Sequence, residues 1–262
     1  MPEGHVLHRL AREHEKSLAD TALTVSSPQG RARAAAADLD GTTLLSVEAL
    51  GKHLFYRSAA VTLHVHLGLF GRFRSYHADV PPPRPTTRLR IQGQGTTIDL
   101  IGPTDCRIVD RQEEETIRER LGPDPLREDG TAEEFAHRLS RRRIAIGAAL
   151  LDQRVIAGVG NIFRAEALFV AAINPLRSAA SVPLAETTAL WKTIRTMMRN
   201  GVRLGRIVSR DPVELGLRSR GAIENANALY VYKLQTCLRC GGTIASAAVG
   251  GRSLYWCPSC QS

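Results

Sequence analysis

Residues 237–260 read CLRCGGTIASAAVGGRSLYWCPSC, in which residues 241–256 separate two Cys-x-x-Cys pairs. This spacing is typical of a four-cysteine zinc site. The short apolar runs on either side of Gly250 and Gly251 predict a β-hairpin between the pairs. Four thiolates complete a tetrahedral shell and leave no position for water, so we expect one structural Zn²⁺. Its ligands are Cys237, Cys240, Cys257 and Cys260.

The segment LLDQRVIAGVGNIFRAEALF, residues 150–169, lies upstream of the cysteines. It predicts the end of one helix, a glycine-containing turn and a second helix capped by Asn161. Gly158 and Gly160 allow backbone N–H groups to approach a ligand closely, and the start of a helix favours an anion. The pattern therefore indicates a phosphate site, with simple capping by Asn161 as the alternative.

The remaining periodicity divides the chain into a β-rich part and a helical part. Short alternating runs separated by Gly and Pro predict a sandwich or flattened barrel between residues 43 and 110. Residues 205–228 have no periodicity, and we expect a mobile loop there. Apolar residues at helical spacing predict helices near residues 5–17, 131–140, 145–153, 161–172 and 183–201. We expect domains over 1–125, 126–232 and 233–262.

Charge is distributed unevenly along the chain. The formal net charge is +9. Residues 1–130 contain 17 Lys and Arg against 18 Asp and Glu, whereas residues 131–262 contain 18 against 8. A basic second half favours a polyanionic partner. No stretch is long and apolar enough to span a membrane, so we expect a soluble protein without a membrane partner.

The chain opens with MPEG, which offers a nucleophile. Removal of Met1 would expose the secondary amine of Pro2, and an α-amine titrates near pH 8 where lysine titrates near 10.4. Such an amine attacks an electrophilic carbon to form an iminium, and Glu3 would supply a proton. Taken alone, Pro2 and Glu3 are a weak signal and favour ordinary terminal residues, and Lys52 in GKHLFY favours a surface lysine.

Four separated motifs together resemble the formamidopyrimidine-DNA glycosylase and endonuclease VIII family, over nearly the whole chain. They are MPEG at 1–4, GKHLFY at 51–56, LLDQRVIAGVGNIFRAE at 150–166 and GRSLYWCPSCQ at 251–261. The opening MPEGHVLHRLA and the sequence GPDPL are most similar to the actinobacterial endonuclease VIII branch.

The resemblance implies an α+β fold, in which a β-sandwich flanked by helices precedes a helix-two-turns-helix domain with a β-hairpin zinc finger. It also implies a bacterial base-excision-repair enzyme that holds damaged double-stranded DNA between its domains. We expect a cytoplasmic, nucleoid-associated monomer that needs no nucleotide cofactor. The implied chemistry is base excision followed by abasic-site lyase cleavage through β- and δ-elimination.

The resemblance also implies roles for individual residues. Pro2 would be the nucleophile, Glu3 the general acid and Lys52 a phosphate-binding and proton-transferring residue. Asn161 and Arg252 would clamp phosphates of the strand that carries the lesion, and the phosphate contact also places Arg252 among the catalytic residues. From residues alone, Arg252 at the hairpin tip favours a solvated surface arginine over a phosphate contact.

A damaged base that leaves the stack needs a side chain to fill its place. The matching loop in HLGLFGRF offers Leu69 and Phe70 as wedges. Leu69 continues the alternation of residues 61–67, which favours a buried position for it. Phe70 is out of phase and is the better candidate.

Several positions depart from the family pattern. His5 and Val6 replace a usual Pro and Glu, and Phe163 replaces a usual Tyr. The segment PTDCR at 103–107 lacks the Arg and Phe that the formamidopyrimidine branch places opposite the lesion. We therefore favour oxidised pyrimidines over oxidised purines as substrates. A non-catalytic, damage-binding zinc-finger protein is the alternative from a different functional class.

Overall fold

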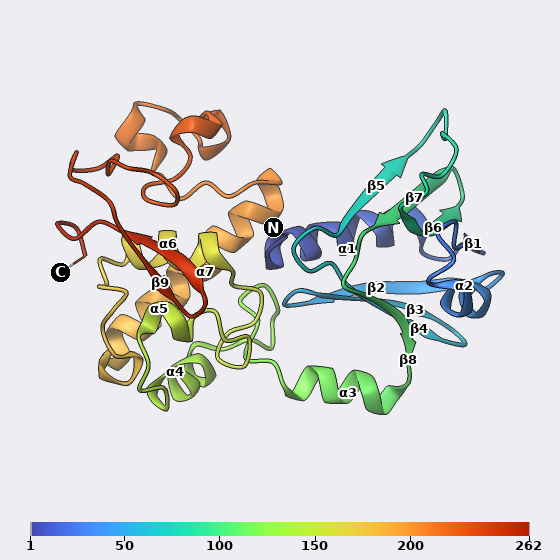
Figure 1. Cartoon of the computed structure of the whole chain (residues 1–262), viewed down its shortest axis with the longest axis horizontal. Helices are drawn as coiled ribbons and strands as arrows, with labels where there is room; N and C mark the ends of the chain where they lie inside the picture. Colours follow the sequence, from blue (N-terminus) through green and yellow to red (C-terminus); the bar gives the residue numbers. More distant parts are fainter. Residues whose placement is uncertain (1, 262) are drawn as a thin grey trace. The chain divides into compact units, whose positions relative to one another are not determined.

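A computed structural model describes residues 2–261. The described chain forms two compact units, which divide between Glu119 and Arg120 (Figure 1). No helix within the described range is long and apolar enough to cross a membrane. Each unit has its own hydrophobic core.

Within residues 2–119, two four-stranded antiparallel sheets form a β-sandwich. The first has the order β1-β6-β7-β5, with β1 Thr24–Ser26, β5 Arg72–Tyr76, β6 Thr87–Gly93 and β7 Thr96–Ile101. The second has the order β2-β3-β4-β8, with β2 Leu44–Leu50, β3 His53–Ser58, β4 Thr62–His66 and β8 Asp105–Val109. Alternate residues such as Leu54, Leu63 and Val65 point into the core.

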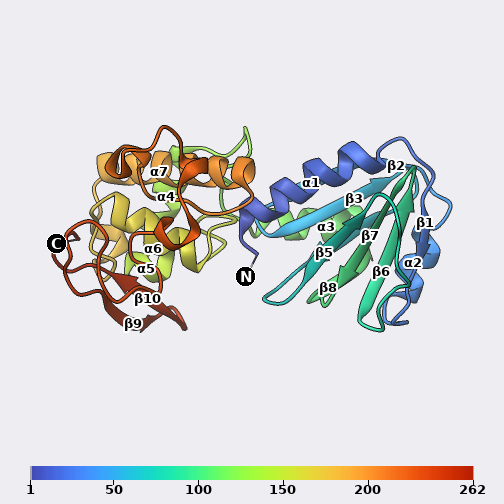
Figure 2. The same ribbon diagram turned by 90° about the horizontal axis from the view of Figure 1, so that it is seen from above.

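Three helices flank this sandwich (Figures 1 and 2). They are α1 Gly4–Leu18, α2 Arg33–Leu39 and α3 Arg111–Glu119. Helix α1 packs on β2 through a face that buries Leu7, Ala11 and Leu18 together with three histidines. It is anchored to β3, because Nδ1 of His14 lies 2.6 Å from the Tyr56 hydroxyl. Helix α3, all of whose residues are described, buries none of them. It is held by ion pairs, among them Arg118 with Glu48.

The second unit, within residues 120–261, is helical and ends in a β-hairpin (Figure 2). Its helices are α4 Ala132–Ser140, α5 Ile146–Ala149, α6 Asn161–Val170 and α7 Leu184–Leu204, and its strands are β9 Ala245–Val249 and β10 Arg252–Trp256. Phe163 and Leu168 of α6 and Trp191 of α7 belong to the central core. The predicted α+β fold with its zinc-finger hairpin is confirmed.

Some local predictions were wrong. Strands β1 and β5 and helices α2 and α3 were not expected, and α5 covers only part of residues 145–153. The segment 205–228, where we expected a loop without regular structure, contains regular structure. The described chain there contains short 3-10 helices at Pro212–Leu215, Arg220–Ala222 and Asn225–Asn227. They pack around a small cluster of Val208, Ile223 and Ala228, which apolar periodicity cannot detect in so short a segment.

Candidate functional site

The start of α1 buries a carboxylate beside Pro2. Glu3 occupies the N-cap position in an extended conformation and is fully buried, but its side chain does not cap the helix. Its carbonyl oxygen instead accepts from the Val6 N–H at 2.8 Å. Pro2 is half-buried. A carboxylate is rarely buried for packing alone, so the burial singles out Glu3. Removal of Met1 would place the Pro2 amine on the adjacent residue.

Lys52 lies in the two-residue turn that joins β2 to β3. Leu50 pairs with His53, so Gly51 and Lys52 alone form the turn. Gly51 has a φ of 58°, which a type II′ turn requires at its first central position. The turn therefore presents a half-buried Lys52 at the end of the sheet.

A group of histidines that sequence reasoning missed lies beside Lys52. His53, His64 and His66 share one face of the second sheet, and their rings lie about 5 Å apart, with centroid distances of 5.1 Å for His53 and His64 and 4.9 Å for His53 and His66. Burial, followed by the neighbouring histidines and Lys52, lowers the pKa of His53 to about 3. The alternation His64-x-His66 opposite His53 was the available signal in the sequence.

The loop between β4 and β5 exposes both wedge candidates. Leu69 is 51% exposed and Phe70 is 81% exposed. The prediction that Leu69 would continue the buried alternation was wrong, because β4 ends at His66. A Cβ on Gly71 would lie 2.2 Å from the Leu67 carbonyl oxygen, so only glycine allows this tight turn.

In the second unit, Gln153 organises the turn before α6. Its Nε2 donates to the carbonyl oxygens of Leu151 and Val159, at 3.0 and 2.9 Å. Its Oε1 accepts from the Gly158 N–H at 3.0 Å. The Gly158 N–H is therefore bonded within the turn, and Gly160 occupies the N-cap position of α6. The phosphate contact expected near these two glycines stays a prediction.

We expected Asn161 to cap α6, but it is the first residue of the helix, and Gly160 occupies the cap position. Its Nδ2 donates to the Ser253 carbonyl oxygen at 2.9 Å, which links the helix to β10. Its Oδ1 is buried and accepts no hydrogen bond from the described residues. The side chain thus connects the helix start to the hairpin instead of closing the helix.

Arg164 holds the β-hairpin in place through hydrogen bonds to its backbone. Its side chain is fully buried. Nη1 donates to the carbonyl oxygens of Gly147 and Val249, both at 2.9 Å, and Nη2 donates to those of Arg252 and Ser253, at 3.0 and 3.2 Å. Arg252, at the start of β10, is exposed. One buried guanidinium thereby holds the backbone from which the Arg252 side chain projects.

The four cysteines meet as predicted. Their Sγ atoms all lie within 4.8 Å of one another, and those of Cys240 and Cys257 are 3.5 Å apart. The Gly242 N–H donates to Cys240 Sγ at 3.4 Å. Such close sulfurs with an N–H donor suit the thiolates of a tetrahedral zinc site. The fifth cysteine, Cys106, is partly buried, and burial raises the pKa of its thiol to about 12.

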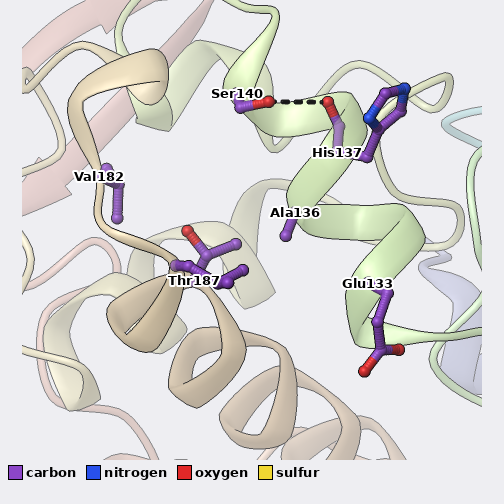
Figure 3. A pocket seen from close by; sticks show the side chains of 7 residues that line it. Glu133, Ala136, His137, Ser140, Val182 and Thr187 are labelled. Carbon is purple, nitrogen blue, oxygen red and sulfur yellow. Dashed lines mark hydrogen bonds between the residues drawn. The ribbon is translucent and has the colours of Figure 1, made fainter.

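A pocket of about 370 Å³ between α4 and the start of α7 lies apart from these residues (Figure 3). In Figure 3, Glu133, Ala136 and His137 line it from α4, and Val182 and Thr187 face them. It contains none of the predicted site residues.

Three family models match the chain. They are the formamidopyrimidine-DNA glycosylase N-terminal domain over residues 1–113, the formamidopyrimidine-DNA glycosylase H2TH domain over 121–212 and the zinc finger found in FPG and IleRS over 235–262. Together they account for most of both units.

Named relatives are similar over long alignments. "Endonuclease 8 1" of Mycobacterium tuberculosis (strain ATCC 25618 / H37Rv) is 41% identical over a 270-residue alignment that covers all of both chains. "Formamidopyrimidine-DNA glycosylase" of Herpetosiphon aurantiacus is 36% identical over 208 residues, covering 77% of this chain and 74% of the relative. Among solved structures, the Lactococcus lactis Fpg complex with abasic-site DNA has a TM-score of 0.81 at 23% identity and 99% coverage of each chain. That likeness supports the fold alone.

Proposed function

This chain belongs to the formamidopyrimidine-DNA glycosylase family, and we propose that it excises oxidised pyrimidines from DNA with Pro2 as its nucleophile. It is a DNA glycosylase with abasic-site lyase activity, its partner is damaged duplex DNA, and its four cysteines bind one structural zinc. The observation that carries the nucleophile assignment is the buried, non-capping side chain of Glu3 next to Pro2.

The chemistry proceeds on the sugar of a nucleotide that has left the stack. The Pro2 amine, freed by removal of Met1, attacks C1′ while the bond to the damaged base breaks. Glu3 supplies the proton that this departure requires. The C1′–O4′ bond then opens, with a proton delivered to O4′, and this converts the Pro2–C1′ adduct into an iminium. The iminium makes the C2′ proton acidic, and successive β- and δ-eliminations then break the strand on both sides of the sugar.

The second unit supplies the phosphate contacts of the same strand. Arg252 projects a guanidinium from the hairpin, and Asn161 presents an amide at the start of α6, where the helix dipole favours negative charge. The link between Asn161 and Ser253 keeps these two groups in a fixed relation. Lys52, from the first unit, would contribute a further positive charge to phosphate binding.

A preference for pyrimidine lesions is supported by the connection between β7 and β8. Only residues 102–104 join the two strands, and the Thr104 N–H donates to the His66 carbonyl oxygen at 2.9 Å. The three residues of this connection carry no side chain as long as the Arg and Phe that the formamidopyrimidine branch uses opposite the lesion. Purine lesions remain the rival substrates.

Variants of the first two residues test the proposal. Pro2→Gly and Glu3→Gln should abolish base excision while leaving the Kd for duplex DNA within about threefold. Glu13→Gln, which removes an exposed carboxylate from the same helix, is the matched control and should act as the parent does. Normal excision by Pro2→Gly would remove the nucleophile assignment. Loss of DNA binding in both variants would instead favour a structural role.

A further inference from the structure

Three side chains form a hydrogen-bonded row across β3, β4 and β8. Nδ1 of His53 lies 2.9 Å from Nε2 of His64, and Nδ1 of His64 lies 3.2 Å from Oδ2 of Asp105. Cross-strand pairing sets their spacing, since His66 faces both His53 and Asp105 in the register. The row ends at His53, the residue that directly follows Lys52.

The chemistry of its members gives the row one direction. A carboxylate only accepts hydrogen bonds, so Nδ1 of His64 carries the hydrogen and donates to Asp105. The Nε2 of a neutral His64 is then an acceptor, and Nδ1 of His53 must donate to it. His53 is thereby held in the tautomer whose remaining nitrogen, Nε2, is an acceptor.

The surroundings keep both rings neutral. Burial lowers the pKa of His64, although Asp105 opposes this shift, and burial with the neighbouring histidines and Lys52 lowers that of His53. The other charged or titratable groups that face the row are His66 and Arg107, whose Nε donates to Asp105 at 3.2 Å. A neutral imidazole with an outward lone pair is a favourable neighbour for an ammonium group.

We propose that the row Asp105–His64–His53 positions Lys52 and keeps it protonated, by presenting an acceptor nitrogen of His53 at the turn that carries Lys52. The row members are positioning residues, since they act through Lys52. The inference rests on the proposed function, in which Lys52 binds a phosphate and transfers a proton.

Two variants separate this row from a simple charge effect. Asp105→Asn permits the reverse direction, because the new amide can donate to His64, and His53 Nε2 would then carry a hydrogen towards Lys52. His64→Phe interrupts the row but keeps the Asp105 charge. Both should lower the pKa of Lys52 by about one unit, whereas His77→Gln, which changes an exposed histidine just after β5, should not.

The measurement is the pH dependence of Lys52 acylation in the full-length protein, mapped by mass spectrometry, alongside the pH profile of kcat for base excision. We expect the alkaline limb of kcat to move to lower pH in both variants, with KM changed less than about threefold. Asp105→Glu should restore the parent profile. A shift in Asp105→Asn alone would reduce the effect to charge and overturn the row, as would an unchanged Lys52 pKa in both variants.

His53→Gln provides a second interruption if His64→Phe does not fold, and the same two outcomes apply to it. The acylation readout does not depend on catalysis. Borohydride trapping of the parent protein on abasic-site DNA tests the proposed function separately. Absence of an adduct there refutes the Pro2 chemistry, while an unshifted Lys52 refutes the row.

Discussion

Nδ2 of Asn161 donates to the carbonyl oxygen of Ser253 at 2.9 Å, which joins the first residue of α6 to strand β10 across more than ninety residues of sequence. The bond couples the helix start to the zinc-finger hairpin. The two elements therefore present their phosphate-binding groups together, and residues that hold this junction should affect stability and DNA binding at once.

Arg164 is the central support of that junction. Arg164→Met removes the charged donor of four carbonyl oxygens from a buried position, so we expect the free energy of unfolding of the second unit to fall by about 3 kcal/mol or more. Both tryptophans, Trp191 and Trp256, belong to this unit, so their fluorescence in urea measures it selectively. Arg203→Met, on the exposed end of α7, is the control, and equal stability of the two variants would contradict the prediction.

Arg252 should contribute one phosphate contact. Arg252→Ala should weaken binding to duplexes of any sequence and reduce the slope of log K against log salt by about one. Arg111→Ala removes another exposed cation, from α3, and controls for net charge. The measurement is a salt titration of DNA affinity by fluorescence anisotropy. An unchanged slope in Arg252→Ala would exclude it from the clamp.

Phe70 should act as the wedge. Phe70→Ala should slow base excision by about tenfold or more, because unstacking the lesion then lacks a side chain to fill the gap. Cleavage of a preformed abasic site, which needs no base departure, should be affected less. Val213→Ala removes a side chain that is equally exposed, at 81%, and should change neither rate. Equal losses of excision and abasic-site cleavage in Phe70→Ala would contradict the wedge.

Acid should destabilise the first unit through its buried histidines. Burial lowers the pKa of His14 to about 4, so between pH 6.5 and 4 the unfolded chain binds a proton that the folded chain does not. Stability is therefore full above pH 6.5 and is lost as the pH falls, by about 2 kcal/mol at pH 5 for this residue. Unfolding followed by near-ultraviolet circular dichroism of tyrosine should show the loss.

His14→Gln should flatten that pH dependence by one proton, whereas His137→Gln, an exposed histidine of the second unit, should leave it unchanged. A parent protein whose first unit is equally stable at pH 5 and pH 7 would show that His14 is not buried in its neutral form.

The parts of the fold that sequence predicted are those with a strong local pattern. The spacing of Cys237 to Cys260 fixed the hairpin, and apolar periodicity located α4, α6 and α7. Helix α3 was missed because it buries no side chain, so it has no apolar stripe, and it is held by ion pairs that lie far apart in sequence. Strand β5, with Arg72 and Arg74, lacks the expected apolar alternation.

The four cysteines could be predicted from their own spacing. The roles of Pro2 and Glu3 came from the family resemblance and stay predictions, and the row from His53 to Asp105 depends on the register of three strands. Asn161 was misplaced by one position, because an asparagine after glycine fits both the cap and the first turn of a helix. Arg164 reads as a surface arginine until its carbonyl partners are known.

The most direct test of the account is borohydride trapping. Untagged protein, with removal of Met1 checked by intact mass, would be incubated with duplexes that carry thymine glycol, 8-oxoguanine or an abasic site. We predict a covalent adduct on Pro2, with a higher yield on thymine glycol than on 8-oxoguanine. No adduct on any duplex, despite measurable DNA binding and bound zinc, would contradict the account and favour a non-catalytic damage-binding protein.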